Sequence, residues 1–259
     1  MQNPLIRKLD HLCGLEPADQ ARLDFGPGRP VAAHHDILAD GSQVSHTSLL
    51  ISGIACRYKM MGSGRRAIVG FLLPGDFTNL LFADRQKLDF GVAALTPCEV
   101  ADVSCAALQA LAGGSSQLAR ALWTSTQMEQ AVQRAWLANI SQCTGDKRMA
   151  HLLCELRQRL AMVGLADGES FRLPITQQEL ADALGLSTVH VNRVLQHLKE
   201  LDLIRMMDRN VIIPDLDRLE AFADFDPGYL YPQKSSDIGK AFPGAVRAAH
   251  TGNPAFTAA

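Results

Sequence analysis

Three side chains between positions 192 and 196 have types that suit hydrogen bonding to a flat, patterned partner. Arg193 presents a planar fork of donors, and the amides of Asn192 and Gln196 each place a donor beside an acceptor. At about 100° per residue, these three and Val189 fall on one side of a helix. That side can bind paired donor and acceptor atoms, with Val189 adding an apolar contact.

The segment that leads up to these residues carries the signals of two short helices joined by a glycine. Thr176 and Glu179 form a capping box, in which hydroxyl and carboxylate satisfy free backbone donors. Gly185 supplies a left-handed turn, and Ser187 caps the second helix. The inward positions of the second helix are Val191, Val194, Leu195 and Leu198. Together these signals predict a helix-turn-helix.

In a helix-turn-helix that reads DNA, the outward side of the second helix enters the major groove. There Arg193 can bridge O6 and N7 of guanine, Asn192 and Gln196 can pair with adenine or a phosphate, and Val189 can touch a thymine methyl. Thr188 at the helix start suits a phosphate. His190 lies at the edge, where a phosphate contact and packing are both open. The predicted DNA-binding residues are Thr176, Gln177, Ser187, Thr188, Val189, His190, Asn192, Arg193 and Gln196.

The stretch LIRMMDRNVIIP after this helix predicts two strands joined through Asp208-Arg209-Asn210, which would be a β-wing. Basic and acidic residues are equal in number over positions 172 to 209. We therefore expect modest non-specific affinity for DNA, with specific contacts supplying a larger share of the binding free energy. The bases are Arg172, Arg193, Lys199, Arg205 and Arg209, and the acids are Glu179, Asp182, Glu200, Asp202 and Asp208. A helical hairpin that binds nothing is the alternative.

Residues 1–115 follow a different pattern, predicted to be all-β after a short opening helix. Short apolar runs end at the turn signals ADG, GSG and PGD, which is typical of a sandwich, roll or barrel. MMGSGRRAIVGF predicts a hairpin with its turn at Gly62, Ser63 and Gly64.

A helix over 116–142 is predicted between the two patterns, because Ser115-Ser116 is a good start and no Pro or Gly follows. Its length of roughly 40 Å suits a helix that joins domains or pairs with a copy of itself, an ordinary core helix being the alternative. Its weakly apolar stripe is Leu118, Leu122, Ser125, Met128, Val132, Ala135 and Asn139. A second domain is expected over 146–231, beginning with a helix at KRMAHLLCELRQRLAMVG, and the Gly-, Pro- and Ala-rich residues 232–259 are expected to be disordered.

Composition predicts an ordinary soluble protein. The 259 residues are 47% hydrophobic with a formal net charge of −2, and no apolar run approaches the ~20 residues of a membrane span. The N-terminus lacks the features of a secretory signal, so a cytoplasmic location is expected. The six cysteines contain no CxxC spacing, which argues against a zinc ribbon or a thioredoxin motif. The sequence identifies no cofactor.

On these residues the chain resembles the Crp/Fnr superfamily of dimeric bacterial transcription regulators. The resemblance rests on ITQQELADALGLSTVHVNRVLQHLKELDLIR, on GFLLPGDF at 70–77 and on TPCEVADVS at 96–104. It implies an α+β architecture: a β-roll sensor domain, a dimerisation helix and a C-terminal winged helix-turn-helix. It also implies a homodimer on a roughly palindromic double-stranded DNA site, with RNA polymerase as a further partner.

The chain departs from the family pattern at informative positions. Where the catabolite activator branch holds a cyclic nucleotide, this chain has Leu80, Leu88 and Asp89, which we take as the effector pocket. Leu88 offers a phosphate no cation and Asp89 would repel one, so cyclic AMP is not expected. A four-cysteine iron–sulfur centre is not expected either, because only Cys13 lies in the N-terminal region. Val189 stands where many members carry a Glu that reads cytosine.

Two other functions are alternatives to this one. The first is a ligand-sensing β-roll protein that acts through protein contacts. The second is a metal-dependent phosphohydrolase built on His34, His35 and Asp36, which lie in strand-like sequence. A haem ligand among the histidines or Cys56, and a redox switch at Cys98 and Cys105, have no supporting pattern.

Overall fold

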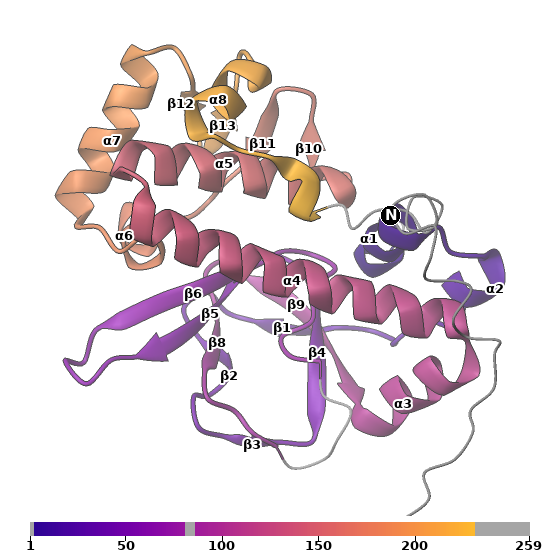
Figure 1. Ribbon diagram of the computed structural model, residues 1–259. Helices are drawn as coiled ribbons and strands as arrows, with labels where there is room; N and C mark the ends of the chain where they lie inside the picture. The colour runs from indigo at the N-terminus through magenta and orange to yellow at the C-terminus, as the bar shows by residue number, and fades with distance from the viewer. Residues whose placement is uncertain (1–2, 81–85, 231–259) are drawn as a thin grey trace, which may run out of the picture.

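The structure is a computed structural model whose described residues are 3–80 and 86–230. The long helix α4 (Ser116–Gln142) runs between an N-terminal domain rich in strands and a group of C-terminal helices (Figure 1). This arrangement confirms the predicted α+β fold class. Over the two described ranges, no helix has the length and hydropathy to cross a membrane.

The strands of the N-terminal domain form antiparallel sheets around an apolar core. One sheet has the order β1-β9-β4, a second has the order β2-β8-β5-β6, and β3 pairs with β7. The predicted hairpin is present as β5 and β6, with its turn over residues 61–65. The strands are β1 (Arg29–Val31), β2 (Asp36–Leu38), β3 (Gln43–Val44), β4 (His46–Ser52), β5 (Ala55–Met60), β6 (Arg66–Leu72), β7 (Gln86–Lys87), β8 (Gly91–Ala94) and β9 (Cys98–Ser104).

Three helices accompany the strands, and two of them differ from the all-β expectation. The opening helix α1 (Pro4–Cys13) was predicted, whereas α2 (Pro17–Gln20) and α3 (Cys105–Gly114) were not. The α3 helix forms because Ser104 Oγ accepts a hydrogen bond from the Ala107 amide at 3.1 Å, and Ala, Leu and Gln follow, which favour helix. Apolar residues of α1 and α3 pack together with the first turns of α4.

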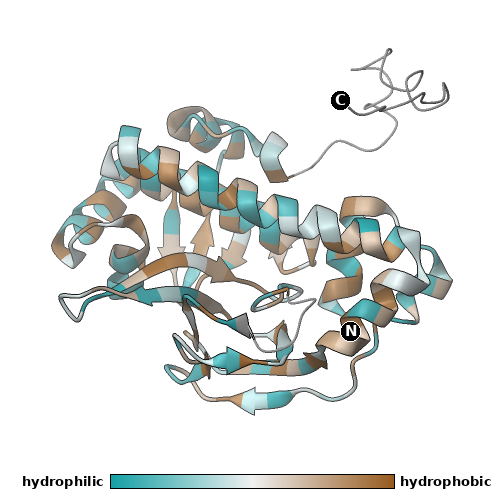
Figure 2. Cartoon of the chain, turned by 60° about the horizontal axis from the view of Figure 1, so that its bottom comes forward, coloured by the Kyte–Doolittle hydropathy of each residue, from teal (hydrophilic) through white to brown (hydrophobic). Residues whose placement is uncertain are grey.

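Helix α4 begins where predicted, because Ser115 Oγ accepts from the Leu118 amide at 3.2 Å. Its buried residues are Leu118, Ala121, Leu122, Ser125, Met128, Val132 and Trp136. Ala135 and Asn139 of the predicted stripe are only half-buried, and Trp136 is buried instead. Hydrophobic and hydrophilic residues alternate along the length of α4 (Figure 2).

The C-terminal module begins with α5 (Gly145–Met162), which follows an extended residue at Cys143. Its four-stranded sheet has the order β10-β11-β13-β12. The predicted wing is confirmed as β12 and β13 with Asp208-Arg209 as its turn, while Asn210 belongs to β13. The other elements are β10 (Ala166–Asp167), β11 (Ser170–Arg172), α6 (Gln177–Leu184), α7 (Thr188–Glu200), β12 (Arg205–Met207), β13 (Asn210–Ile212), α8 (Leu216–Ala223) and η1 (Pro227–Leu230). The predicted disordered tail, 232–259, lies outside the described residues.

Candidate nucleic-acid interface

Local hydrogen bonds shape α6, the turn and α7 as the sequence predicts. The capping box is present: Thr176 Oγ1 accepts from the Glu179 amide at 3.2 Å, and Glu179 Oε2 accepts from the Thr176 amide at 2.7 Å. Gly185 adopts φ 64° and ψ 36°, the left-handed conformation that a glycine adopts without steric cost. Ser187 Oγ accepts from the His190 amide at 3.2 Å and starts α7.

The two sides of α7 differ sharply in exposure. Val191, Val194 and Leu198 are at most 1% exposed and seat the helix in the module. On the other side Val189 is 70% exposed, and Asn192, Arg193 and Gln196 are exposed with it. Thr176, Gln177, Ser187 and His190 are also exposed, and Thr188 is half-buried. The structure therefore leaves the outward side of α7 open to a partner.

Three of the predicted DNA-binding residues, Asn192, Gln177 and His190, lie against a neighbouring helix of the chain. Asn192 Nδ2 donates to Gln177 Oε1 across 3.5 Å, which links the outward side of α7 to the first residue of α6. The His190 imidazole lies so close to the start of α5 that a methyl group on Gly145 would be 3.0 Å from Nε2. His190 thus packs against α5 while much of its ring stays exposed.

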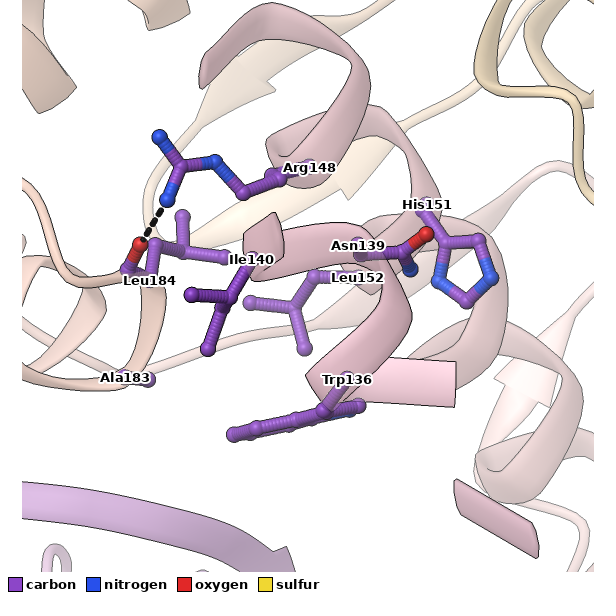
Figure 3. Close-up of a pocket in the computed structure, with 8 residues that line it drawn as sticks. All are labelled: Trp136, Asn139, Ile140, Arg148, His151, Leu152, Ala183 and Leu184. Carbon is purple, nitrogen blue, oxygen red and sulfur yellow. Dashed lines mark hydrogen bonds between the residues drawn. The ribbon is translucent and has the colours of Figure 1, made fainter. Parts of the chain in front are cut away.

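Helix α5 holds α6 and α7 in place through side-chain contacts. Arg148 Nη1 donates to the Leu184 carbonyl at 2.7 Å and holds the last turn of α6 (Figure 3). His197 Nδ1 lies 3.0 Å from Asp146 Oδ2, which joins α7 to the start of α5. A crevice opens where α4, α5 and α6 meet, lined by Trp136, Asn139, Ile140, Arg148, His151, Leu152, Ala183 and Leu184 (Figure 3). Burial lowers the pKa of His151 to about 4, so the imidazole is neutral at physiological pH.

Helix α6 also contacts the N-terminal domain. Arg66 Nη2, at the start of β6, lies 3.5 Å from Asp182 Oδ2. His34 Nδ1 lies 3.7 Å from Oε1 of Glu179, the carboxylate of the capping box. The β5–β6 hairpin accordingly runs beside α6 (Figure 1). Both contacts bind α6 to the N-terminal domain.

The structure does not bring the three predicted effector residues together. Leu80 is half-buried against the cluster of α1, α3 and α4, whereas Leu88 is buried among the strands. Asp89 is exposed, and its Oδ2 lies 3.0 Å from Lys59 Nζ. These three residues were predicted to form an effector pocket from their spacing to the GDF motif at 75–77. That role stays a prediction.

A shallow cleft lies elsewhere, between β6 of the N-terminal domain, α4 and α5. Arg57 Nη2 bonds to Glu129 Oε2 at 2.8 Å there, and the Arg57 side chain also donates to the carbonyls of Phe77 and Thr78. Glu129 Oε1 is buried and has no hydrogen-bond partner among the described residues. The lining residues are Arg57, Val69, Gly70, Phe71, Met128, Glu129, Val132, Gln133 and Arg159. Sequence reasoning missed this cleft, because it joins segments far apart in the chain.

The residues considered for a metal site have separate partners. His34 faces Glu179, His35 Nδ1 lies 3.1 Å from the Ala33 carbonyl, and Asp36 Oδ2 accepts from Tyr58 at 2.9 Å. Across the part of the chain that the structure describes, no three metal-binding side chains converge. None of the six cysteines, all of which lie in the described residues, forms a disulfide, and burial raises the pKa of Cys56 to about 12.

Comparison with known proteins identifies the family. Residues 147–222 match the Crp-like helix-turn-helix domain, and residues 29–113 match the cyclic nucleotide-binding domain. A probable transcriptional activator of Rhizobium leguminosarum bv. viciae is 30% identical over 74% of this chain and 79% of its own length. The chain belongs to the Crp/Fnr family. The nitrogen fixation regulation protein FixK of Rhizobium meliloti is 31% identical over 81% of this chain and 90% of its own.

A solved structure agrees with the Crp/Fnr fold. FixK2 from Bradyrhizobium japonicum superposes with a TM-score of 0.66 at 24% identity, covering 75% of this chain and 96% of that one. This Crp/Fnr protein is therefore a DNA-binding transcriptional regulator, and the relatives named above are regulators rather than enzymes.

Proposed function

We propose that this Crp/Fnr protein is a homodimer that reads a two-fold-symmetric DNA site through the outward side of α7. The observation that carries the proposal is the contrast between the two sides of that helix. Val191 and Val194 are buried, while Val189, Asn192 and Arg193 are exposed next to one another. The Val189 side chain is apolar and forms no hydrogen bond with water, so it is suited to contact the methyl group of a thymine.

The proposed contacts divide into base readout and backbone positioning. Arg193 binds a guanine through two donors, and Asn192 and Gln196 pair with adenine edges or a phosphate. Thr176 and Gln177 at the start of α6, and Ser187 and Thr188 at the start of α7, face phosphates, because free backbone amides there attract anions. His190 adds a phosphate contact from its exposed edge.

The dimer is proposed to form along α4. Trp123 is 64% exposed, Leu137 is 70% exposed and Ile140 is 48% exposed, which is unusual for large apolar side chains on one helix. Trp123 and Leu137 lie two heptads apart, so both fall on one seam of a coiled coil with Gln130 between them. A parallel pair of such helices gives a two-fold axis and half-sites about one helical turn, roughly 34 Å, apart.

The signal is proposed to reach the protein at the β-roll, in the cleft between β6 and α4. The free oxygen of Glu129 accepts a donor there, and the apolar walls of Val69 and Phe71 suit a small ligand with an N–H or O–H group. We propose that this ligand is not a cyclic nucleotide, since Asp89, predicted to stand where the family binds a phosphate, would repel that group. Leu80, Leu88 and Asp89 do not line this cleft, and their part in an effector pocket stays a prediction.

Selection of operators from random DNA, at a stated salt concentration, tests the proposed function. A recovered site with two inverted half-sites supports the proposal, and the absence of any enriched sequence contradicts it. We expect the protein to act in the cytoplasm and, at its operator, to contact RNA polymerase. Transcription from a template with the selected site, with and without the protein, checks that last step.

A further inference from the structure

A continuous chain of buried polar groups connects the parts of this regulator. Lys8 of α1 donates to Asp76 Oδ1 at 2.7 Å, and Arg159 of α5 donates to Asp76 Oδ2 at 2.8 Å. Arg159 also donates to Glu155 Oε1 at 3.0 Å. The second oxygen of Glu155 accepts from Trp136 Nε1 of α4 at 2.8 Å. One network thus joins the opening helix, the sensor domain, the dimerisation helix and the DNA-binding module.

The network is dry. The residues Lys8, Asp76, Glu155 and Arg159 are 2%, 3%, 0% and 7% exposed. Burial alone would raise the pKa of Asp76, but Lys8 and Arg159 hold it at about 2. Two cations and two carboxylates balance, so removal of any one leaves an unpaired charge in a low-dielectric interior.

Arg159 is the centre of this network, and its guanidinium crosses between modules. Besides the two carboxylates it donates to the Phe71 carbonyl of β6 at 2.9 Å. It therefore holds the end of β6 and the turn after it against α5, the helix on which α6 and α7 rest. A fork of five donors can satisfy three acceptors in this way, and a lysine cannot reproduce that geometry.

Arg159 also borders the cleft proposed above to receive the signal. The cleft's lining includes Arg159 and Glu129, whose Oε1 is buried without a hydrogen-bond partner in the described residues. A smaller hollow that Arg159 also lines includes Lys8, Asp76, Met128 and Met162. Arg159 thus borders two hollows, and the first of them also has the unpaired Glu129 oxygen in its lining.

We propose that Arg159 is the positioning residue through which the sensor domain sets the position of the DNA-reading helices. In the arrangement described here it binds Asp76, Glu155 and the Phe71 carbonyl. An occupant of the cleft, or a bond to Glu129, changes those contacts and moves α5 relative to β6. This inference rests on the proposed function, because it concerns how the same DNA-reading side is regulated.

Matched variants on one helix test the inference. Arg159→Lys keeps the charge and loses the fork, and Arg157→Lys makes the same change at a residue that donates to the Gly168 carbonyl inside the DNA-binding module. Operator binding is measured in the otherwise unaltered protein, because Trp123 lies on the proposed dimer seam. Quenching is measured in Trp123→Phe protein, in which the remaining tryptophan, Trp136, reports on the network. We expect Arg159→Lys to make the fluorescence of Trp136 easier to quench and to weaken operator binding about tenfold. Arg157→Lys should leave both the quenching and the affinity close to those of the parent protein. Unchanged quenching and affinity in a folded Arg159→Lys protein would overturn the proposal.

Hydrogen exchange on the unaltered full chain provides a test that does not depend on a variant folding. Linkage is reciprocal, so operator DNA must change the network if the network changes operator binding. We expect slower exchange at amides of residues 71–77 and 155–160 when operator is bound. Protection confined to residues 172–209 contradicts the inference. If selection recovers no operator, the proposed function is wrong. If an operator is recovered but the variants and hydrogen exchange give the contradicting results, only the role of Arg159 is wrong.

Discussion

The Asn192 amide on α7 donates to the Gln177 amide oxygen on α6 across 3.5 Å. The two residues are 15 positions apart in the chain and are brought together by the left-handed turn at Gly185. One hydrogen of Nδ2 points to Gln177, which leaves the other hydrogen and Oδ1 of Asn192 free. Those two groups are the ones that pair with N7 and the amino group of adenine.

Gln177→Ala should therefore relax the preference for adenine at the base that Asn192 contacts. We expect a loss of about 0.5–1.5 kcal/mol at that base, the size of one hydrogen bond, with preferences elsewhere unchanged. Gln178→Ala is the matched control, because that neighbouring amide donates to Asp182 Oδ1 instead. Binding to operators altered at single positions measures the effect, and equal losses for the two variants would contradict the role of Gln177.

Arg193→Ala should separate specific from non-specific binding. The two donors that read a guanine are lost, so specific affinity should fall by about 1–3 kcal/mol while non-specific affinity stays nearly the same. Titrations with operator and with unrelated DNA at the same salt concentration provide the comparison. Equal losses on both DNAs would mean that Arg193 binds a phosphate rather than a base.

The local signals in the sequence predicted the DNA-reading helices well. Thr176, Glu179, Gly185 and Ser187 act within a few residues of themselves, through caps and a turn, so their effects can be derived from spacing alone. The wing and the start of α4 were predicted for the same reason. By contrast, the sequence did not predict α3, because its cap, Ser104, is also the last residue of β9, whose strand pattern dominates that region.

Long-range contacts explain what the sequence could not reveal. Lys8 and Asp76 are 68 positions apart, and Asp76 and Arg159 are 83 positions apart, so no periodic pattern links them. The effector residues were placed by counting from a turn, yet Leu80 and Leu88 pack against different clusters. Which side chains line a cleft depends on how α4 and α5 pack on β6, and that packing has no local signature.

Gly185→Ala should destabilise the DNA-binding module, although the added methyl group would not clash with a neighbouring atom. The backbone at Gly185 has φ 64°, and the nearest atom to an added methyl group, Arg148 Nη1, is 3.9 Å away. The cost is therefore conformational, about 1–2 kcal/mol of unfolding free energy. Urea unfolding checks this value. Gly185→Asn should cost less, because asparagine tolerates the left-handed region better, and an equal cost for both would contradict the argument.

Burial of His151 should make stability fall in mildly acidic solution. Burial lowers its pKa to about 4 from 6.5, so between these values the unfolded chain binds a proton that the folded chain does not. The contribution of His151 to the free energy of unfolding is fully present above pH 6.5 and declines as the pH falls toward 4. We expect the free energy of unfolding to be about 2 kcal/mol lower at pH 5 than at pH 7.5 from His151 alone. His151→Phe, which can keep the packing against Phe225 and Tyr229, should lose about that much of the pH dependence in urea titrations.

The exposed seam of α4 can be tested by placing a charge on it. Leu137 is 70% exposed, so Leu137→Glu costs the isolated chain little and instead puts two like charges against each other in a dimer. We expect dimerisation to weaken by at least about tenfold, since a buried unpaired charge costs more than 1.4 kcal/mol. Ala138→Glu introduces the same charge about 100° around the helix, outside the seam, and should leave the dimer intact. Sedimentation equilibrium distinguishes these outcomes. A Leu137→Glu protein that stays as dimeric as the parent would mean that the copies meet on another surface.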